Sequence, residues 1–284
     1  MTAEKQNKII PGVTVNDEIS SLLINQPSML NLLIESDYIA FSVQTIPDNL
    51  VFHIQTFDIS SLKTRAEKET GIEKLLMENE WLKKNYASVH VGISNHLLTI
   101  VPDKFYDAAQ SDLFINFNIE VPEKSSVRTD ELNILSSKLI YACSQKIEDS
   151  LRLYYQNCKI NHATTLLLQS LAVAAENDSL IVYVEPHRVQ FIIFSEGKLK
   201  FYNCFLYQAA ADYAYFLLNV CKQLNLDSEK IKVVLYGEVV KNSDIFNITY
   251  KYIRNVSFGG RPNGKNYSAA FDFPAHFYFN LFSL

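Results

Sequence analysis

Residues 180–205 read LIVYVEPHRVQFIIFSEGKLKFYNCF, and this stretch is the strongest indication of the fold class in the sequence. Apolar and polar residues alternate within it, and short turns at 186–187 and 196–197 interrupt the alternation. This spacing is typical of antiparallel hairpins. Residues 209–225 then carry apolar side chains at helical spacing. The predicted elements are the strands Leu180–Glu185, Arg188–Ser195 and Lys198–Phe205, the helix Ala209–Asn225 and the strand Ile231–Tyr236.

The same order of elements occurs about 150 residues earlier in the chain. Three alternating runs are again separated by short polar turns, and a long, highly charged segment follows them. Ser60 or Ser61 is the expected N-cap of this helix, and Gly71 is a possible break within it. The predicted elements are the strands Leu30–Ile34, Tyr38–Gln44 and Leu50–Phe57, the helix Ser61–Lys84 and the strand Ser88–Ile93. The sequence therefore predicts a duplicated β-β-β-α-β unit.

A different unit lies between the two copies. Its predicted elements are the strand His96–Val101, the short helix Asp103–Ser111, the strand Leu113–Val121, the polar loop Val121–Asp130, the strand Lys138–Cys143 and a helix from Gln145 to about Asn157. Asn161 is then expected to cap an almost entirely apolar helix, Ala163–Ala175. A helix that is apolar on most sides is buried, so we expect this one between two lobes.

Composition limits the classes of function. The chain has 284 residues, 48% of them hydrophobic, and a net charge of −5, which gives no general attraction to nucleic acid or anionic lipid. Its four cysteines show no C-x-x-C spacing, which favours reduced thiols over disulfides or a zinc site. Residues 166–175 are too short to cross a bilayer, and residues 1–11 lack the apolar core of a secretion signal. We therefore expect a cytoplasmic protein with no nucleic-acid partner, no integral membrane segment and no bound metal.

Two such lobes joined by a buried helix resemble the superfamily of actin and the sugar kinases, whose lobes are both ribonuclease H-like. The segments 88–102, 138–157 and 161–175 are similar in order and spacing to parts of pilus-assembly and cell-division actin-like proteins. Over nearly its whole length the chain also looks like a bacterial family of unknown function with an actin-like ATPase fold. The resemblance implies an α/β fold with a first lobe at 1–176, an inserted unit at about 96–160 within it, and a second lobe at 177–284.

Active members of that superfamily bind phosphates between the lobes, on turns that carry an acid, a glycine and small hydroxyl residues. Glycine lets backbone N–H groups approach phosphate oxygens, and the acid holds magnesium through water. Here the first turn reads Ile34-Glu35-Ser36-Asp37-Tyr38 and has no glycine. The second reads Val184-Glu185-Pro186-His187-Arg188, where the proline removes a donor. The adenosine-facing motif of the family ends in paired glycines, whereas Leu235-Tyr236-Gly237-Glu238 keeps one.

These departures argue against nucleotide as a cofactor. Glu35, Asp37 and Glu185 are the only acids at these turns that a metal could use, and ordinary turn carboxylates are the simpler interpretation. Residues 259–266, GGRPNGKN, nearly fit a phosphate loop, but Asn266 stands where the hydroxyl residue is needed. A solvated connection with basic residues is the simpler interpretation, in which Arg261 and Lys265 remain able to touch an anionic partner.

Other enzyme classes have still less support. The chain has no G-x-S-x-G, no H-E-x-x-H and too few strand carboxylates for a metal-dependent nuclease. The C-terminal residues 271–282 hold six aromatic side chains. We expect them to dock into the core, with an exposed, partner-binding patch as the alternative.

The sequence thus predicts a non-catalytic actin-like scaffold or interaction protein with an unidentified protein partner. The alternative is a divergent ATP-binding protein or ATPase, with Glu35, Asp37 or Glu185 at the metal, Gly237 at the nucleotide and Lys265 as a phosphate clamp. A weaker alternative is a filament-forming protein, as several of the proteins that it resembles are.

Overall fold

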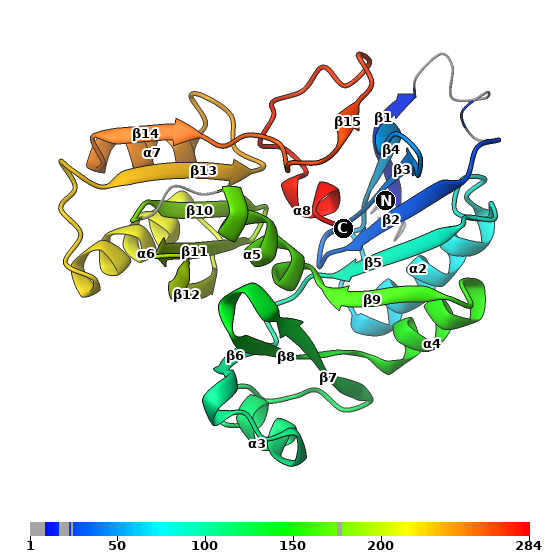
Figure 1. Ribbon diagram of the computed structural model, residues 1–284, viewed down its shortest axis with the longest axis horizontal. Helices are drawn as coiled ribbons and strands as arrows, with labels where there is room; N and C mark the ends of the chain where they lie inside the picture. Colours follow the sequence, from blue (N-terminus) through cyan, green and yellow to red (C-terminus); the bar gives the residue numbers. More distant parts are fainter. Residues whose placement is uncertain (1–8, 17–22, 24, 175–177) are drawn as a thin grey trace, which may run out of the picture.

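The computed structural model describes residues 9–16, 23, 25–174 and 178–284. It is a mixed α/β structure in which two large sheets lie on either side of a central layer of helices, with a third, smaller sheet at one end (Figure 1). The predicted helix end at Ala175, the predicted boundary between 176 and 177 and residues 1–8 of the segment considered as a secretion signal lie outside the described residues.

The first sheet has seven strands in the order β1-β4-β3-β2-β5-β9, and β15 also pairs with β4. Its strands are β1 (Ile10–Asn16), β2 (Ser28–Ile34), β3 (Tyr38–Thr45), β4 (Leu50–Asp58), β5 (Ser88–Ile93), β9 (Cys158–His162) and β15 (Asn266–Tyr267). The four strands predicted for the first copy are confirmed, with small shifts at their ends. We did not predict β1 or β9. β1 is mostly exposed and contains proline and glycine, and β9 is a short edge strand with three polar residues.

The helix of the first copy, α2 (Arg65–Glu78), is shorter than predicted at both ends. Its N-cap is Thr64, not Ser60 or Ser61. The Thr64 hydroxyl accepts from the Glu67 amide at 3.2 Å, and the Glu67 carboxylate accepts from the Thr64 amide at 2.9 Å, which is a capping box. Gly71 does not break the helix. A Cβ there would lie 2.7 Å from Leu62 Cδ1, so the glycine makes room for this side chain.

The second sheet has the order β12-β11-β10-β13-β14. Its elements are β10 (Leu180–Glu185), β11 (Arg188–Ser195), β12 (Lys198–Leu206), α6 (Ala210–Gln223), β13 (Lys232–Gly237), α7 (Asp244–Tyr252) and β14 (Asn255–Phe258). β10 and β11 match the predicted bounds, and β12, α6 and β13 are confirmed within one residue at most ends. As in the first sheet, three antiparallel strands are followed by a helix and a strand that pairs in parallel with the first of them.

The inserted unit forms the third sheet, in the order β6-β8-β7. Its elements are β6 (Leu98–Pro102), the 3-10 turns η1 (Asp103–Phe105) and η2 (Ala108–Gln110), α3 (Ser111–Asn116), β7 (Ser125–Leu132), the 3-10 turn η3 (Asn133–Leu135) and β8 (Ser137–Ser144). The strand predicted at 113–121 is wrong, because its first part is the helix α3. The polar loop predicted at 121–130 is wrong in its second half, which is β7.

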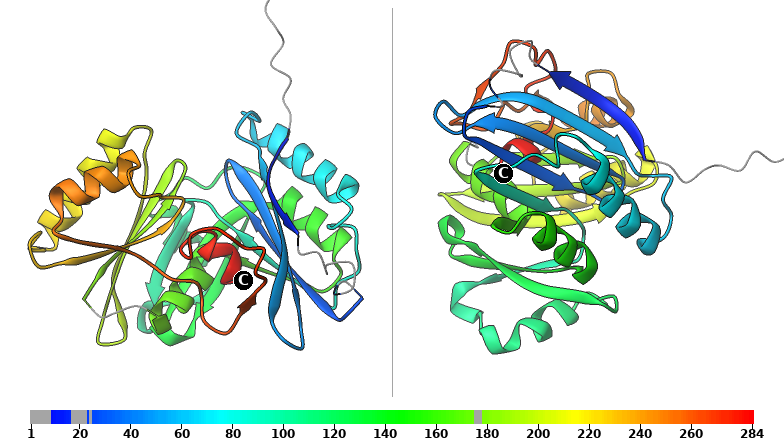
Figure 2. Two further views of the ribbon diagram at one scale, coloured as in Figure 1. Left: turned by 90° about the horizontal axis from the view of Figure 1, so that it is seen from above. Right: turned by 90° about the vertical axis from the view of Figure 1, so that its right-hand side faces the viewer.

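Two helices lie between the two large sheets, α5 (Ala163–Ala174) and α8 (Phe279–Phe282), while α4 (Gln145–Tyr154) packs beside α2 (Figure 2). Seen from above, α5 and the C-terminal segment with α8 occupy the space between the sheets (Figure 2). This confirms the buried position predicted for α5, although Val173 near its end is exposed. Asn161 lies in β9 and is not the N-cap of α5, because His162 is the residue before the helix and its Nδ1 accepts from the Thr164 amide at 3.2 Å.

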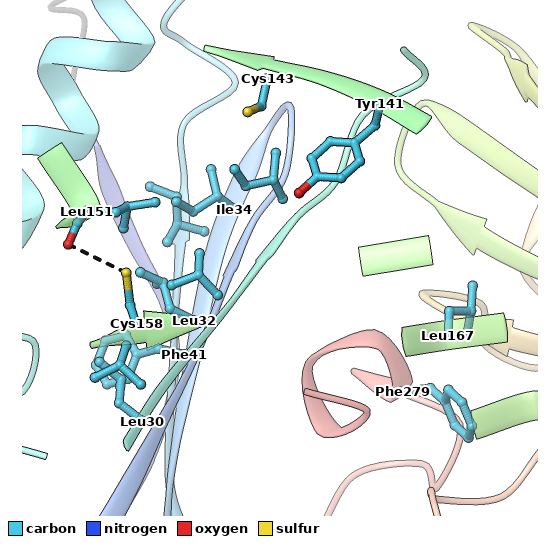
Figure 3. Close-up of a cluster of buried hydrophobic side chains, with 14 of the residues drawn as sticks. Leu30, Leu32, Ile34, Phe41, Tyr141, Cys143, Leu151, Cys158, Leu167 and Phe279 are labelled. Atoms are coloured by element: carbon cyan, nitrogen blue, oxygen red, sulfur yellow. Dashed lines mark hydrogen bonds between the residues drawn. The ribbon is translucent and has the colours of Figure 1, made fainter. Parts of the chain in front are cut away.

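The main core joins side chains from all these layers. Leu30, Leu32 and Phe41 on one face of the first sheet pack beside Leu151 and Cys158, while Leu167 and Phe279 lie toward the second sheet (Figure 3). A second cluster fills the space between the second sheet and α6 and α7. Phe271, Tyr278, Leu281 and Phe282 are buried against the opposite face of the first sheet. Docking of the aromatic C-terminal segment into the core is therefore confirmed, and the exposed-patch alternative is wrong.

None of the helices in the described residues is long and apolar enough to span a membrane.

Candidate functional site

The candidate site lies where the β2–β3 and β10–β11 hairpins approach each other. The first turn, 35–37, is closed by a hydrogen bond from the Glu35 amide to the Tyr38 carbonyl at 2.9 Å. The second turn contains only Pro186 and His187, so Glu185 and Arg188 are directly opposite each other in the ladder. His187 Nε2 lies 4.0 Å from Asp37 Oδ2, which brings the two turns together. These are the two places at which the resemblance put the phosphate-binding turns.

A buried ion pair stands at the base of the second turn. Glu185 and Arg188 are almost completely buried, and Arg188 Nε donates to Glu185 Oε2 at 2.5 Å. Arg188 Nη2 also donates to Glu185 Oε1 and to the Ser94 hydroxyl, which follows β5 in the first sheet. Burial opposes the charge of Arg188, but the Glu185 carboxylate outweighs it and raises the pKa of the guanidinium. The pair thus ties the second sheet to the first.

Glu35 comes to the same place from the end of β2. Its side chain is 7% exposed, and its Oε1 atom has no hydrogen-bond partner among the described residues. Burial and the nearby Glu185 carboxylate raise the pKa of Glu35 well above its usual value, and Arg188 only partly offsets them. The uncharged, protonated form of this carboxyl is therefore favoured.

The space left between the hairpins is small. A cavity of about 40 Å³ is lined by residues of both turns, with Glu35, Glu185 and Arg188 at its base. One water molecule occupies about 30 Å³ of liquid, whereas pockets for drug-sized ligands measure about 300–1,000 Å³. The cavity therefore has room for a single small group.

A larger cleft adjoins this cavity and opens between the lobes. It measures about 480 Å³ and shares Asp37, Tyr38, Pro186 and His187 with the cavity. One wall comes from β1 and the end of β4, and the other from residues 238–243 and 277–278. Three carboxylates line it (Asp37, Asp58 and Glu238), and no lysine or arginine does in the part of the chain that the structure describes.

Gly237 is the last residue of β13 and lies beside this cleft. Its φ is +83°, and a Cβ there would lie 2.1 Å from the Val184 carbonyl oxygen. That carbonyl accepts from the Glu238 amide at 2.9 Å, and the Gly237 amide donates to the His276 carbonyl at 3.0 Å. A glycine is therefore needed here for the close approach of β13 and β10.

The structure brings Glu35, Asp37 and Glu185 together and puts Gly237 next to them, but it does not bring Lys265 there. Lys265 precedes β15, which pairs with the start of β4, whereas Tyr38 pairs with Asp58 at the other end of that strand. The eight residue steps from Leu50 to Asp58 span roughly 26 Å. Burial lowers the pKa of Lys265 to about 8, and its Nζ has no partner among the residues described.

Arg261 is also turned inward. Its guanidinium lies over the rings of Tyr267 and Phe273, at 4.4 and 5.4 Å, and donates to the Phe271 carbonyl at 2.9 Å. The segment that follows it leads into β15 and not into a helix, which differs from the context that a phosphate loop needs.

Sequence reasoning missed Arg188 as the partner of Glu185. A usable signal was present: a two-residue turn places the residues on either side of it opposite each other, and here they have opposite charges. It also missed the cleft wall contributed by Asp58, Phe277 and Tyr278, because the C-terminal segment returns to the site from far along the sequence.

The arrangement of the two large sheets is the two-lobed actin-like ATPase fold. The chain belongs to the family described as protein of unknown function (DUF3822), whose model matches residues 18–256. A protein of Bacteroides thetaiotaomicron, described as having an actin-like ATPase fold and unknown function, superposes with a TM-score of 0.73 at 20% sequence identity, covering 83% of this chain and 92% of that one.

More distant similarities connect the chain to two other solved structures. The ethanolamine utilization protein EutJ of Carboxydothermus hydrogenoformans has a TM-score of 0.48 at 8% identity, covering 83% of this chain and 86% of that one. The filament structure of AlfA from B. subtilis has a TM-score of 0.43 at 9% identity, covering 89% and 96%. No curated protein matches the sequence.

Proposed function

We propose that this protein is a non-catalytic, actin-like binding protein that has lost nucleotide chemistry and acts through contacts with a partner protein. We also propose that its lobes divide at residues 176 and 177, with the third sheet as an insertion in the first lobe. The first proposal starts from the closed arrangement of the two hairpins, and the second from the three separate sheets.

The observation that carries the proposal is the interlobe ion pair with its 40 Å³ cavity. A triphosphate would have to occupy the position of the Glu185–Arg188 pair and its contact with Ser94. Breaking a buried pair on one side costs several kcal/mol, on the order of 3–5. Few backbone N–H groups are available in return, because Pro186 has none and Glu35 uses its own on Tyr38.

The neighbouring cleft is large enough for a nucleotide but carries the wrong charge. Asp37, Asp58 and Glu238 line it, and no lysine or arginine of the described residues does, although Lys68 outside the lining lies 3.6 Å from Asp37. Like charges near a protein surface repel by about 4 kcal/mol at 4 Å. Size therefore disfavours phosphate in the inner cavity, and charge disfavours it in the outer cleft.

The test is titration of the whole protein with ATP and ADP, each with magnesium, followed by calorimetry and a phosphate-release assay. We expect no binding at millimolar nucleotide and no ATPase activity above the buffer rate. Micromolar affinity would contradict the proposal. A measurable rate that Glu185→Ala abolishes, but that Glu229→Ala on the far side of the second lobe leaves unchanged, would favour the ATPase alternative instead.

A further inference from the structure

The two hairpins bury one carboxyl more than they bury cations. Glu35 and Glu185 are both less than a tenth exposed, and Arg188 is the cation that they share. Arg188 gives its Nε and Nη2 donors to Glu185 and Ser94, so Glu35 Oε1 is left without a partner among the described residues. A buried polar group without a partner is costly. The Glu35 and Glu185 carboxyls also share a side-chain hydrogen bond, in which a protonated Glu35 donates to the Glu185 carboxylate. A positively charged donor that reached Glu35 could take the place of this proton and balance the second carboxylate.

We propose that this interlobe site binds a primary ammonium group carried on an unbranched alkyl chain, with the ammonium against Glu35 and the chain in the adjoining cleft. The inference deepens the proposed function, because it rests on a cleft that does not hold nucleotide. It assigns the chemistry of the ligand, which two sources share: a free diamine, or a lysine side chain of a partner protein.

The small volume of the inner cavity favours an ammonium group over a guanidinium group. The inner cavity of about 40 Å³ takes one water-sized group. An alkylammonium head is compact and has three donors, whereas a guanidinium is a wide planar fork. A metal ion is a poorer match, because no group of three or more His, Cys, Asp or Glu side chains in the described residues is placed to hold one.

The outer cleft suits the rest of such a ligand. Phe57, Phe277 and Tyr278 provide apolar and aromatic walls that an alkyl chain can contact. Asp58 and Glu238 stand farther out from the inner cavity and are exposed to solvent. A second cation at the far end of the chain would meet their carboxylates.

Binding should also release a proton. Glu35 is held mainly protonated by burial and by Glu185, and an ammonium beside it would favour the charged carboxylate. The other titratable and charged groups facing this region come from the surrounding elements, including Lys68 of α2 at Asp37: Asp37, Tyr38, Lys68, His96, Tyr183, Glu185, His187, Arg188, Tyr207 and Glu238. With the ligand bound, two carboxylates would face two cations.

The experiment is calorimetric titration of the whole protein at neutral pH with cadaverine, pentylamine, pentanediol and the fully N-methylated form of cadaverine. We expect both amines to bind, the diol not to bind, and the methylated compound to bind at least about tenfold more weakly. Titration in two buffers of different ionisation enthalpy should show a net release of protons on amine binding, with one proton per amine as the upper limit. Failure of cadaverine to bind, or equal affinity for the methylated compound, would overturn the proposal.

Three variants locate the contact. Glu35→Gln keeps the shape of the side chain but should abolish proton release and weaken both amines, with folding checked by thermal unfolding. Glu238→Gln should weaken cadaverine more than pentylamine, because Glu238 acts on Glu35 as well as on the far end of the chain. Glu229→Gln, an exposed change outside the cleft, should alter neither. Proton release that persists in Glu35→Gln would refute the assignment even if the amines bind.

Two further arms separate the sources and the competing explanations. A short peptide with one lysine, compared with its acetyl-lysine form, tests the protein source. Tighter binding of the peptide supports a partner's side chain, and tighter binding of cadaverine supports a free diamine. Displacement of the amine by millimolar magnesium would overturn the inference in favour of a metal site. Binding of nucleotide to the same sample would instead refute the proposed function, whatever the amine result.

Discussion

The side chain of Asp130 holds the start of α5 in place, although it belongs to a different element. It lies in β7, yet its carboxylate accepts from the His162 amide at 2.7 Å and from the Thr165 hydroxyl at 2.8 Å. Asn161 Nδ2 donates to it at 3.1 Å. His162 is the residue just before α5 and Thr165 lies in its first turn, so these contacts hold the start of the helix in place. The inserted sheet therefore holds the N-terminus of the central helix, which sequence reasoning had assigned to Asn161.

Glu35 gives the clearest pH dependence at the residue scale. Its pKa is raised in the folded state by burial and by Glu185, so between about pH 4.5 and its folded pKa the native chain holds a proton that the unfolded chain has lost. Its contribution to stability is fully present below the unfolded pKa and is lost as pH rises. Glu35→Gln has no titrating group at this position, so it does not lose stability in this way. The free energy of unfolding of the variant should therefore rise relative to that of wild type as pH rises.

The measurement is urea unfolding of both proteins across the pH range from 4 to 9. The difference in free energy of unfolding should grow with pH by no more than about 1.4 kcal/mol per unit, since one proton is involved. Glu229→Gln, a change at an exposed site, should give a flat difference. A difference for Glu35→Gln that is also flat would mean that this carboxyl is charged in the folded protein.

At the scale of elements, β3 and β11 were predictable from their alternating residues and the short turns beside them, although both strands are buried on both faces. The segment 113–121 also alternates, but its first part is α3, which ends at Asn116. Ile115 is buried in the cluster beside the third sheet, and Phe114 and Ile119 are partly buried against it. β7 was predicted as a polar loop because most of its residues are polar. One of them, Asp130, is nevertheless buried, since it hydrogen-bonds to residues at the start of α5. In the candidate site, the acids at the turns were predictable, whereas Phe277 and Tyr278 were not, since only the tertiary fold brings the C-terminus there.

Gly237 offers a test of the crossing between β10 and β13. Gly237→Ala must accept both a left-handed φ and a contact of 2.1 Å with the Val184 carbonyl oxygen. Gly264 has a φ of +80°, but nothing lies within 4 Å of the position that a Cβ would take there. Gly264→Ala should therefore show the cost of the backbone conformation alone, on the order of 1 kcal/mol.

We expect Gly237→Ala to lose at least about 2 kcal/mol more than Gly264→Ala, because backbone atoms cannot move aside as a side chain can. Urea unfolding of the two variants measures the difference, and Gly260→Ala, with neither feature, gives the baseline. Equal costs for Gly237 and Gly264 would mean that the two strands separate without penalty at this point.

At the scale of the whole molecule, α8 connects the two large sheets. Phe279 packs edge-on against Tyr236 of β13 with ring centroids 4.8 Å apart, and the Asn280 amide donates to the Tyr183 hydroxyl of β10 at 3.3 Å. Leu281 and Phe282 are buried against Leu33 and other residues of the first sheet. One turn of helix thus contributes to the packing of both lobes, together with the ion pair at the hairpins.

This arrangement predicts that damage to the second lobe is felt in the first. Leu217 is fully buried in the cluster behind the second sheet, so Leu217→Ala should cost about 2–5 kcal/mol. The chain's single tryptophan, Trp81, stacks on His53 in the first lobe with ring centroids 3.9 Å apart, and its fluorescence reports unfolding there. We expect Leu217→Ala to lower the urea midpoint read by Trp81 as much as the midpoint read by circular dichroism.

Phe279→Ala provides the matched comparison, because it removes the ring that joins α8 to the second sheet without touching Leu217 or Trp81. In this background, the Trp81 midpoint should respond less to Leu217→Ala than the circular dichroism midpoint does, since the lobes have lost part of their shared core. If Leu217→Ala leaves the Trp81 midpoint unchanged in the otherwise wild-type chain, the lobes unfold independently. The α8 segment would then fill the space between the sheets without coupling their stability.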